Sequence, residues 1–123
     1  MAYVSKTYKT FKDQVVSDAT GGNTGECVSY VKQCCKGLGS TSTWKKSTIQ
    51  VKGATTLEKG TAIATFDSKG KYRGHAAIYA GQSADGLQVW DQWKTHAVSP
   101  RSIAFRDGKG SVVNDGDQYF VVD

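Results

Sequence analysis

The chain is poor in cysteine and carries no motif of the kind that builds a disulfide-rich or zinc-bound fold. Only three cysteines occur in 123 residues, all within the stretch TGECVSYVKQCC at positions 24–35. Three is an odd number for a disulfide framework, and a chain of this length buries a core without cross-links. No C-x-x-C pair occurs, and His75 and His96 lack the short spacings of zinc ligands. We therefore expect neither a metal nor another cofactor.

Long apolar runs are also missing. The N-terminal stretch MAYVSKTYKTFKDQ resembles neither a signal peptide nor a membrane span. We therefore expect synthesis in the cytoplasm, no membrane insertion, and a route other than general secretion if the protein acts elsewhere. No internal repeat or low-complexity tract is visible, and the length predicts one compact domain over residues 1–123.

The charge balance is basic, with a net charge of +5 and a pI near 9.1. The lysines are dispersed along the chain, apart from the pair Lys45 and Lys46. One interpretation is a solvated surface that keeps the protein in solution. The other is attraction to an anionic polymer, such as nucleic acid or cell wall, and charge alone does not choose between them.

The first third of the chain predicts two helices. Tyr8, Phe11 and Val15 recur at helical spacing, which predicts an amphipathic helix over residues 7–18. The stretch TGGNTG at 20–25 is a loop. A second helix is expected to begin near Thr24 or Gly25, with Glu26 in its first turn, and to close at GLG (37–39). Its buried stripe is formed by Val28, Val31, Cys34, Cys35 and Leu38.

Strand signals follow a polar, turn-rich stretch in which Trp44, Ile49 and Val51 are the expected anchors. The predicted strands cover 61–66, 75–82, 87–93, 102–105 and 118–122, and SADG (83–86) joins the second and third as a hairpin. Helices come first and strands follow. This order predicts an α+β fold in which N-terminal helices pack on a small antiparallel sheet.

The cysteines differ in the chemistry that their predicted positions allow. Cys27 falls in the first turn of the second helix, where the partial positive charge of the helix stabilises a thiolate. Cys34 and Cys35 fall in the apolar stripe, where cysteine behaves as a small hydrophobic residue. Cys27 is therefore the candidate nucleophile, and its backbone N–H is a candidate oxyanion donor.

A thiolate nucleophile needs a base, and His75 is the better candidate of the two histidines. It opens a strand directly behind Gly74, which would let the backbone pass close to another element. His96 is expected in a loop, as an ordinary surface residue.

The residue that orients His75 depends on the geometry of the hairpin. If SADG is a four-residue loop, Gln92 shares the face of His75; if ADG is a three-residue loop with Gly86 left-handed, Asp91 does. A glycine at the end of a three-residue loop is what that turn prefers. We therefore predict Asp91, with Gln92 as the possible substitute.

These pieces, in this order, resemble a known superfamily. GECVSYVKQCC, then GHAAIYAG, then a carboxylate on the next strand is similar to the papain-like cell-wall peptidases of the NlpC and CHAP types. The T-x-x-W segment at Trp44, GTAIATF, and DQW…V…R-x-I-x-F at 91–105 resemble a small family of interbacterial amidase effectors that are delivered by type VI secretion. The resemblance covers about residues 20–105.

The resemblance implies a papain-like fold and hydrolysis of a stem or cross-link amide bond in peptidoglycan. Cys27 would be the nucleophile, His75 the base and then the acid, and Asp91 the orienting residue. It also implies a secretion apparatus as carrier, a cognate immunity protein, and action in the periplasm of a target bacterium. The candidate residues for the substrate groove are Glu26, Tyr30, Tyr79, Trp90 and Trp93.

Two other functions fit the same sequence. One keeps the fold and makes the protein a thiol acyltransferase or an amidase of lipid or protein substrates. The other is a non-enzymatic basic binding module, for example for nucleic acid, although the chain lacks a combined basic and aromatic motif. We expect no nucleic-acid partner. The sequence does not identify the bond cut or the second oxyanion donor.

Overall fold

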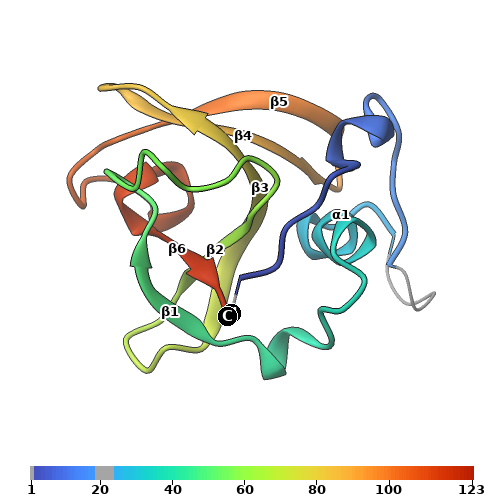
Figure 1. Ribbon diagram of the computed structural model, residues 1–123, viewed down its shortest axis with the longest axis horizontal. Helices are drawn as coiled ribbons and strands as arrows, with labels where there is room; N and C mark the ends of the chain where they lie inside the picture. The colour runs from blue at the N-terminus through green and yellow to red at the C-terminus, as the bar shows by residue number, and fades with distance from the viewer. Residues whose placement is uncertain (1, 19–23) are drawn as a thin grey trace.

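The computed structural model describes residues 2–18 and 24–123, in which one curved sheet is flanked by an α-helix (Figure 1). The sheet has the order β1-β6-β2-β3-β4-β5, and every neighbouring pair is antiparallel. The predicted α+β class is therefore confirmed. The elements are η1 (Tyr8–Phe11), α1 (Cys27–Cys34), η2 (Thr41–Thr43), β1 (Lys46–Gln50), β2 (Ala62–Phe66), β3 (Tyr72–Gln82), β4 (Gly86–Trp93), β5 (His96–Ala104), η3 (Val112–Asn114), η4 (Gly116–Gln118) and β6 (Tyr119–Val122).

The core consists of two apolar clusters, one on each face of the sheet. Alternating residues of β3 supply both, because successive side chains of a strand point to opposite faces. Ala76 and Ile78 pack toward α1, whereas Ala77 and Tyr79 pack toward the C-terminal segment. Figure 1 shows α1 beside one face of the sheet and the short helical turns that precede β6 (red) beside the other. The helix is thus pressed against the strand that carries His75.

The predicted helix over residues 7–18 is wrong. Only the single turn η1 is helical, and Asp13, at a φ of 66°, ends it. The chain then pairs with β5: the Asp13 N–H donates to the Val98 carbonyl at 2.8 Å, and the Val98 N–H donates to the Gln14 carbonyl at 2.9 Å. Hydrogen bonds to a distant strand override the helical spacing of the apolar residues, and Val15 is 62% exposed.

The second predicted helix exists but is shorter than expected. It begins at Cys27, with Glu26 as the N-cap in place of Thr24, and ends at Cys34, before the predicted stop at GLG. Val31, Cys35 and Leu38 are buried, as the apolar stripe predicts. Most of the predicted loop at 20–25 lies outside the described residues.

The five predicted strands are all present, although β5 starts at His96, before the predicted start at residue 102. Sequence reasoning missed β1, which is almost wholly exposed and pairs with the C-terminal strand β6. Of the three expected anchors in this region, Trp44 and Val51 are buried, whereas Ile49 is 46% exposed. A polar edge strand leaves no apolar alternation to detect.

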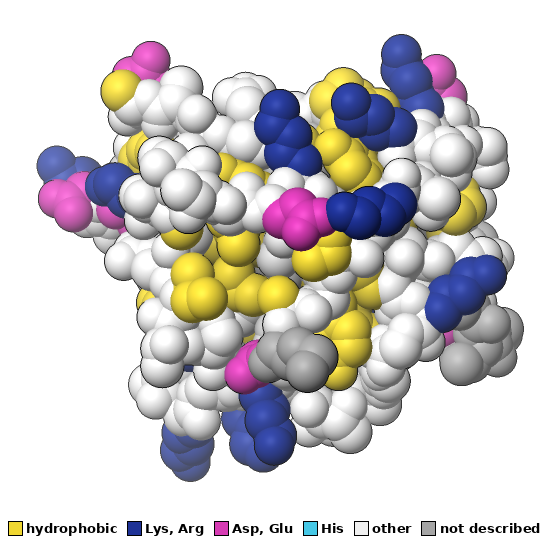
Figure 2. All heavy atoms as spheres, in the orientation of Figure 1, with side chains coloured by type: hydrophobic (Ala, Val, Ile, Leu, Met, Phe, Trp, Pro, Cys, Tyr) yellow, Lys and Arg dark blue, Asp and Glu magenta, His cyan; other side chains and the backbone are white. Residues whose placement is uncertain are grey.

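The basic side chains are spread over the molecule. On the face drawn in Figure 2, Lys and Arg side chains lie at the perimeter and on the upper part of the face, with apolar side chains between them. In the part of the chain that the structure describes, no helix has the length and apolar character that crossing a bilayer requires.

A substitution at Gly60 tests how the N-terminal segment packs against the sheet. Gly60 has a φ of 102°, and an added Cβ would lie 2.1 Å from the Ser5 carbonyl oxygen. We expect Gly60→Ala to lower the free energy of unfolding by at least about 3 kcal/mol, since strain and a backbone clash combine. Urea denaturation measures this.

The matched control for Gly60→Ala is Gly53→Ala. Gly53 has a φ of 86°, but its Cβ would meet no described heavy atom within 4 Å. This variant should lose only about 1 kcal/mol, from strain alone. Equal losses in the two variants would contradict the packing described for Gly60.

Candidate active site

Cys27 is the first residue of α1, and its backbone position follows from the N-cap before it. Glu26 is extended, with a ψ of 155°, and its carbonyl accepts a hydrogen bond from the Ser29 N–H at 3.1 Å. The first N–H groups of a helix have no partner inside the helix and form its positive end. The thiol is therefore placed where a negative charge is stabilised.

Gln92 fastens this end of the helix to strand β4. Its side chain is fully buried, and its Oε1 accepts from the Val16 N–H at 2.9 Å. Its Nε2 donates to the carbonyls of Val16 and Glu26, both at 2.9 Å. Gln92, the predicted substitute for Asp91, therefore lies on the helix side of the sheet and holds the N-cap of α1.

His75 is held on β3 by its neighbours in the strand pair. The backbone N–H of His75 donates to Thr65 Oγ1 at 3.0 Å. Gly74 before it has a φ of 109°, and an added Cβ would lie 2.6 Å from the same Thr65 oxygen. The close approach expected from the glycine before His75 is thus confirmed, and Thr65 is the group that is approached.

The hairpin between β3 and β4 differs from the predicted turn. Gln82 lies opposite Leu87, so the loop has four residues and the predicted three-residue turn is wrong. Further along, Tyr79 lies opposite Val89, which leaves Ala80 as an extra residue in β3. This extra residue is a β-bulge, which shifts the register by one.

The bulge decides which residue of β4 shares the face of His75. A four-residue loop alone would place Gln92 there, and the one-residue shift replaces it with Asp91. Asp91 Oδ2 lies 2.7 Å from His75 Nε2. The predicted neighbour of His75 is therefore correct, although a bulge produces it and not the turn.

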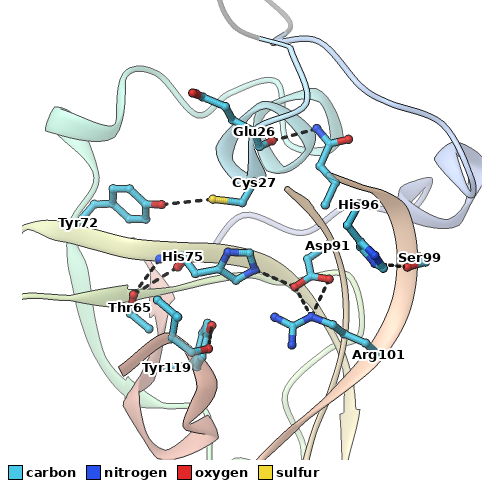
Figure 3. Close-up of polar contacts among 12 residues, drawn as sticks. Glu26, Cys27, Thr65, Tyr72, His75, Asp91, His96, Ser99, Arg101 and Tyr119 are labelled. Carbon is cyan, nitrogen blue, oxygen red and sulfur yellow. Dashed lines mark hydrogen bonds and ion pairs between the residues drawn. The ribbon is translucent and has the colours of Figure 1, made fainter. Parts of the chain in front are cut away.

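The thiol, the imidazole and the carboxylate lie in one row (Figure 3). Because Nε2 faces Asp91, the other ring nitrogen, Nδ1, is the one left for Cys27. The Asp91 side chain is fully buried, and that of His75 is 10% exposed. A buried carboxylate next to the ring favours the Nε2–H tautomer and stabilises an imidazolium.

The pKa values of the pair move in opposite directions. Burial disfavours the Cys27 thiolate, but the hydrogen bond to His75, its positive charge and the Tyr72 hydroxyl outweigh burial, so the pKa of Cys27 is lowered. Burial disfavours the imidazolium too, yet bonds to Asp91 and Cys27 raise the pKa of His75 to about 9. Both shifts favour the thiolate–imidazolium form of the pair over the neutral form.

The other cysteines behave differently. Burial raises the pKa of Cys34 to about 11 and that of Cys35 to about 12. Both pack with the core cluster beside α1. Neither thiol is ionised at neutral pH, as their place in the apolar stripe predicts.

Two residues that touch this row were not identified from the sequence. The Tyr72 hydroxyl lies 3.5 Å from Cys27 Sγ, and Arg101 Nε lies 3.1 and 2.8 Å from the two oxygens of Asp91. Tyr72 stands three residues before His75, and Arg101 stands in the R-x-I-x-F segment. Tyr72 has no local pattern that separates it from an ordinary strand residue. Arg101 stands in a segment that resembles the effector family, but nothing in that segment assigned it to the site.

A cavity of about 590 Å³ opens over the row, and Cys27 and His75 lie in its wall. Glu26 and Trp93, two of the predicted groove residues, also line it, as do Tyr72, Lys32 and Lys94. The wall therefore carries charges of both signs beside an exposed indole.

The other three predicted groove residues do not line this cavity, and that expectation is wrong. Tyr30 and Tyr79 expose 0% and 2% of their surface and belong to the two core clusters. Trp90 packs edge-on against Tyr8, with ring centroids 6.1 Å apart. On a half-buried sheet, aromatic residues are more often core than substrate contacts.

His96 also differs from the expected surface loop. It opens β5, its ring stacks on Trp93 at a centroid distance of 4.0 Å, and its Nε2 lies 2.6 Å from Ser99 Oγ. Within residues 2–18 and 24–123, no three His, Cys, Asp or Glu side chains gather as metal ligands would.

A helix that presents a thiol at its start, packed on an antiparallel sheet that presents a histidine and a carboxylate, defines the papain-like class of fold. The chain superimposes on the solved structure of type 6 secretion amidase effector 2 with a TM-score of 0.78 and 31% identity, covering 98% of this chain and 94% of that one. The predicted papain-like fold is therefore confirmed.

The sequence comparisons agree with the fold. A family model described as domesticated amidase effector 2 matches residues 2–122. A domesticated amidase effector 2 from Ixodes scapularis is 36% identical over 80% of this chain and 70% of its own length. A type VI secretion amidase effector 2 protein from Salmonella typhi is 33% identical over all of both chains. The chain belongs to the domesticated amidase effector 2 family.

The lowered pKa of Cys27 predicts selective alkylation. At each pH between 6 and 8, Cys27 should react with iodoacetamide faster than the other two thiols, whereas Cys34 and Cys35 should stay protonated and unmodified. Peptide mass spectrometry of the labelled protein locates the modification. His75→Ala removes the groups that lower the pKa and should move the onset of labelling to higher pH. Equal labelling of the three thiols in the folded protein would contradict the assignment.

Gln92 gives a separate prediction about stability. Gln92→Met keeps the volume but leaves the Val16 N–H and carbonyl and the Glu26 carbonyl without their side-chain partner. We expect a loss of about 2–4 kcal/mol in the free energy of unfolding, measured in urea. Gln88→Met on the same strand is the control, since Gln88 is exposed and should change stability by less than about 0.5 kcal/mol. Similar losses at both positions would show that Gln92 does not anchor the helix.

Proposed function

We propose that the protein is a cysteine amidase that hydrolyses a peptide-stem or cross-link amide bond of bacterial peptidoglycan. The observation that carries the proposal is the row of Cys27, His75 and Asp91, of which Cys27 and His75 lie in the wall of an open cavity. Membership of an amidase effector family supports the class of bond. The residues are those of a nucleophile, its base and the group that orients the base.

The reaction begins with the thiolate–imidazolium pair. Cys27 Sγ attacks the amide carbonyl, and a tetrahedral oxyanion forms. His75 then donates its proton to the leaving amine, which departs and leaves a thioester on Cys27. Neutral His75 takes a proton from water, the hydroxide attacks the thioester, and Cys27 leaves as a thiolate. Asp91 holds the ring throughout by its contact with Nε2.

The oxyanion needs donors close to the sulfur. The backbone N–H of Cys27 is one, because it belongs to the first turn of α1. The Tyr72 hydroxyl, 3.5 Å from Sγ, is the second donor that we assign. Tyr72 packs edge-on against Trp44, with ring centroids 5.1 Å apart, and this contact limits its movement. Both donors are in place before substrate arrives.

The proposed setting is the cell wall of a competing bacterium. A relative bears the name of a type VI secretion effector, and we propose the same apparatus as carrier and the periplasm of the target cell as the place of action. A cognate immunity protein that covers the cavity would protect the producing cell. The net charge of +5 fits an anionic wall. Residues 1–123 would act as one domain.

The proposal predicts that the purified protein digests peptidoglycan sacculi and that Cys27→Ala abolishes the digestion. Asp91→Asn should lower the rate by about 10²-fold or more, because the ring of His75 loses its anionic partner. Chromatography and mass spectrometry of the released muropeptides report both the activity and the bond that is cut.

Cys34→Ser is the matched control, since it replaces a thiol that is not ionised at neutral pH, and it should keep the activity. Intact muropeptides alongside a modified lipid or protein substrate would favour the acyltransferase alternative. Periplasmic toxicity that survives Cys27→Ala would favour a binding module, and either result would refute a wall amidase.

A further inference from the structure

Arg101 is a half-buried partner of Asp91 that the mechanism above does not use. It lies on β5 opposite Val89 of β4, and its side chain is 25% exposed. Its Nε donates to both carboxylate oxygens, at 3.1 Å to Oδ1 and 2.8 Å to Oδ2. Asp91 therefore lies between two cations, the imidazolium of His75 and this guanidinium (Figure 3).

The two-oxygen contact restrains the carboxylate. With His75 alone, the carboxylate could rotate and still keep one bond to Nε2. Contact of Arg101 Nε with both oxygens adds a second anchor beside the bond to His75, and the two anchors together restrain where Oδ2 meets the ring. A small misplacement of a proton-transfer group has a large effect on rate.

An aromatic wall restrains Arg101 in turn. Its guanidinium carbon lies 5.1 Å from the centroid of the Trp93 ring, a cation–π distance. Trp93 stacks on His96, with an interplanar angle of 12°, and His96 contacts Ser99. Trp93 also lines the cavity. Arg101 is thus held from one side by Asp91 and from the other by a residue of the substrate cavity.

Arg101 also acts on the pair through its charge. A fixed positive charge beside Asp91 weakens the pull of the carboxylate on the His75 proton and favours the Cys27 thiolate. The charged and titratable groups near the pair are Glu26 and Lys32 on and before α1, Tyr72 on β3, Lys94 after β4, Arg101 on β5 and Tyr119 on β6. Of the cations Lys32, Lys94 and Arg101, Arg101 is the one that contacts Asp91.

We propose that Arg101 is a positioning residue of the hydrolysis, which fixes the carboxylate of Asp91 against His75 and lowers the proton affinity of the Cys27–His75 pair. The substrate part of this inference rests on the proposed amidase function. The electrostatic part does not, because alkylation of Cys27 reports it without any substrate.

The experiment compares Arg101→Gln and Arg101→Lys with Arg106→Gln in the full chain. Arg106 is exposed beyond β5, and its Nε donates to the Asn114 carbonyl, so this control makes the same charge change away from the row. The measurements are kcat and KM on soluble cross-linked muropeptides against pH, the rate of Cys27 alkylation by iodoacetamide against pH, and thermal unfolding.

For Arg101→Gln we expect kcat to fall about 10- to 100-fold at an unchanged KM. The rising limb of the alkylation profile and both limbs of the kcat/KM profile should move to higher pH by about 0.5–1 unit, since removal of a positive charge raises both proton affinities. Arg101→Lys keeps the charge and should leave the limbs in place while kcat falls several-fold. Arg106→Gln should change neither kcat nor the position of the limbs.

A purely structural role is the alternative, and it would lower the melting temperature without moving any limb. Unmoved limbs in folded Arg101→Gln, or a wild-type kcat in Arg101→Lys, would overturn the proposal. If Arg101→Gln does not fold, the kcat of Arg101→Lys decides. If the wild-type protein leaves muropeptides intact, the amidase proposal fails, and the alkylation profiles still decide whether Arg101 acts on the pair.

Discussion

Two adjacent residues of strand β4 hold the two halves of the site. Asp91 points to one face of the sheet and contacts His75, and Gln92 points to the other and binds the carbonyl of Glu26, next to Cys27. Successive residues of a strand must face opposite ways, so one short segment orients the imidazole and anchors the helix that carries the thiol. The geometry of the thiol–imidazole pair therefore depends on the register of β4 relative to β3.

That register has a local cause, a one-residue bulge, which the sequence pattern does not reveal. The loop of the hairpin, taken alone, would bring Gln92 to His75, and the extra residue Ala80 reverses the outcome. Gly81, at a φ of 127°, lies next to the extra residue and provides the backbone conformation there. A turn leaves a signature in two or three residues, whereas a bulge depends on the pairing of both strands. The sequence could thus predict Asp91 as the neighbour of His75 without the correct reason.

The elements that were predictable are those whose residues carry a pattern of their own. Strands β2, β3 and β4 have apolar runs bounded by turns, and the start of α1 follows a loop signal. The three strands and the helix start could therefore be predicted. The segment over residues 7–18 failed because its conformation is set by pairing with Val98 and by the bonds of Gln92 to Val16. Those partners lie about eighty residues away in the chain, and the helical spacing of Tyr8 and Phe11 does not reveal them. Arg101 was not identified for the same reason, because its contact with Asp91 depends on the pairing of β5 with β4.

The three cysteines show how position, and not residue type, assigns chemistry in this fold. Cys27 and Cys34 are the first and last residues of the same helix. At the first, the hydrogen bond to His75, its charge and the Tyr72 hydroxyl outweigh burial and lower the thiol pKa; at the last, burial is the larger effect and raises the pKa to about 11. Burial acts in the same direction on both, so the difference comes from the charges that the sheet brings to one end of the helix. The imidazolium of His75 contacts Asp91, and Asp91 in turn accepts a hydrogen bond from Arg101. The reactivity of one sulfur is therefore set by a row of alternating charges that begins on a helix and ends on the outermost strand of the sheet.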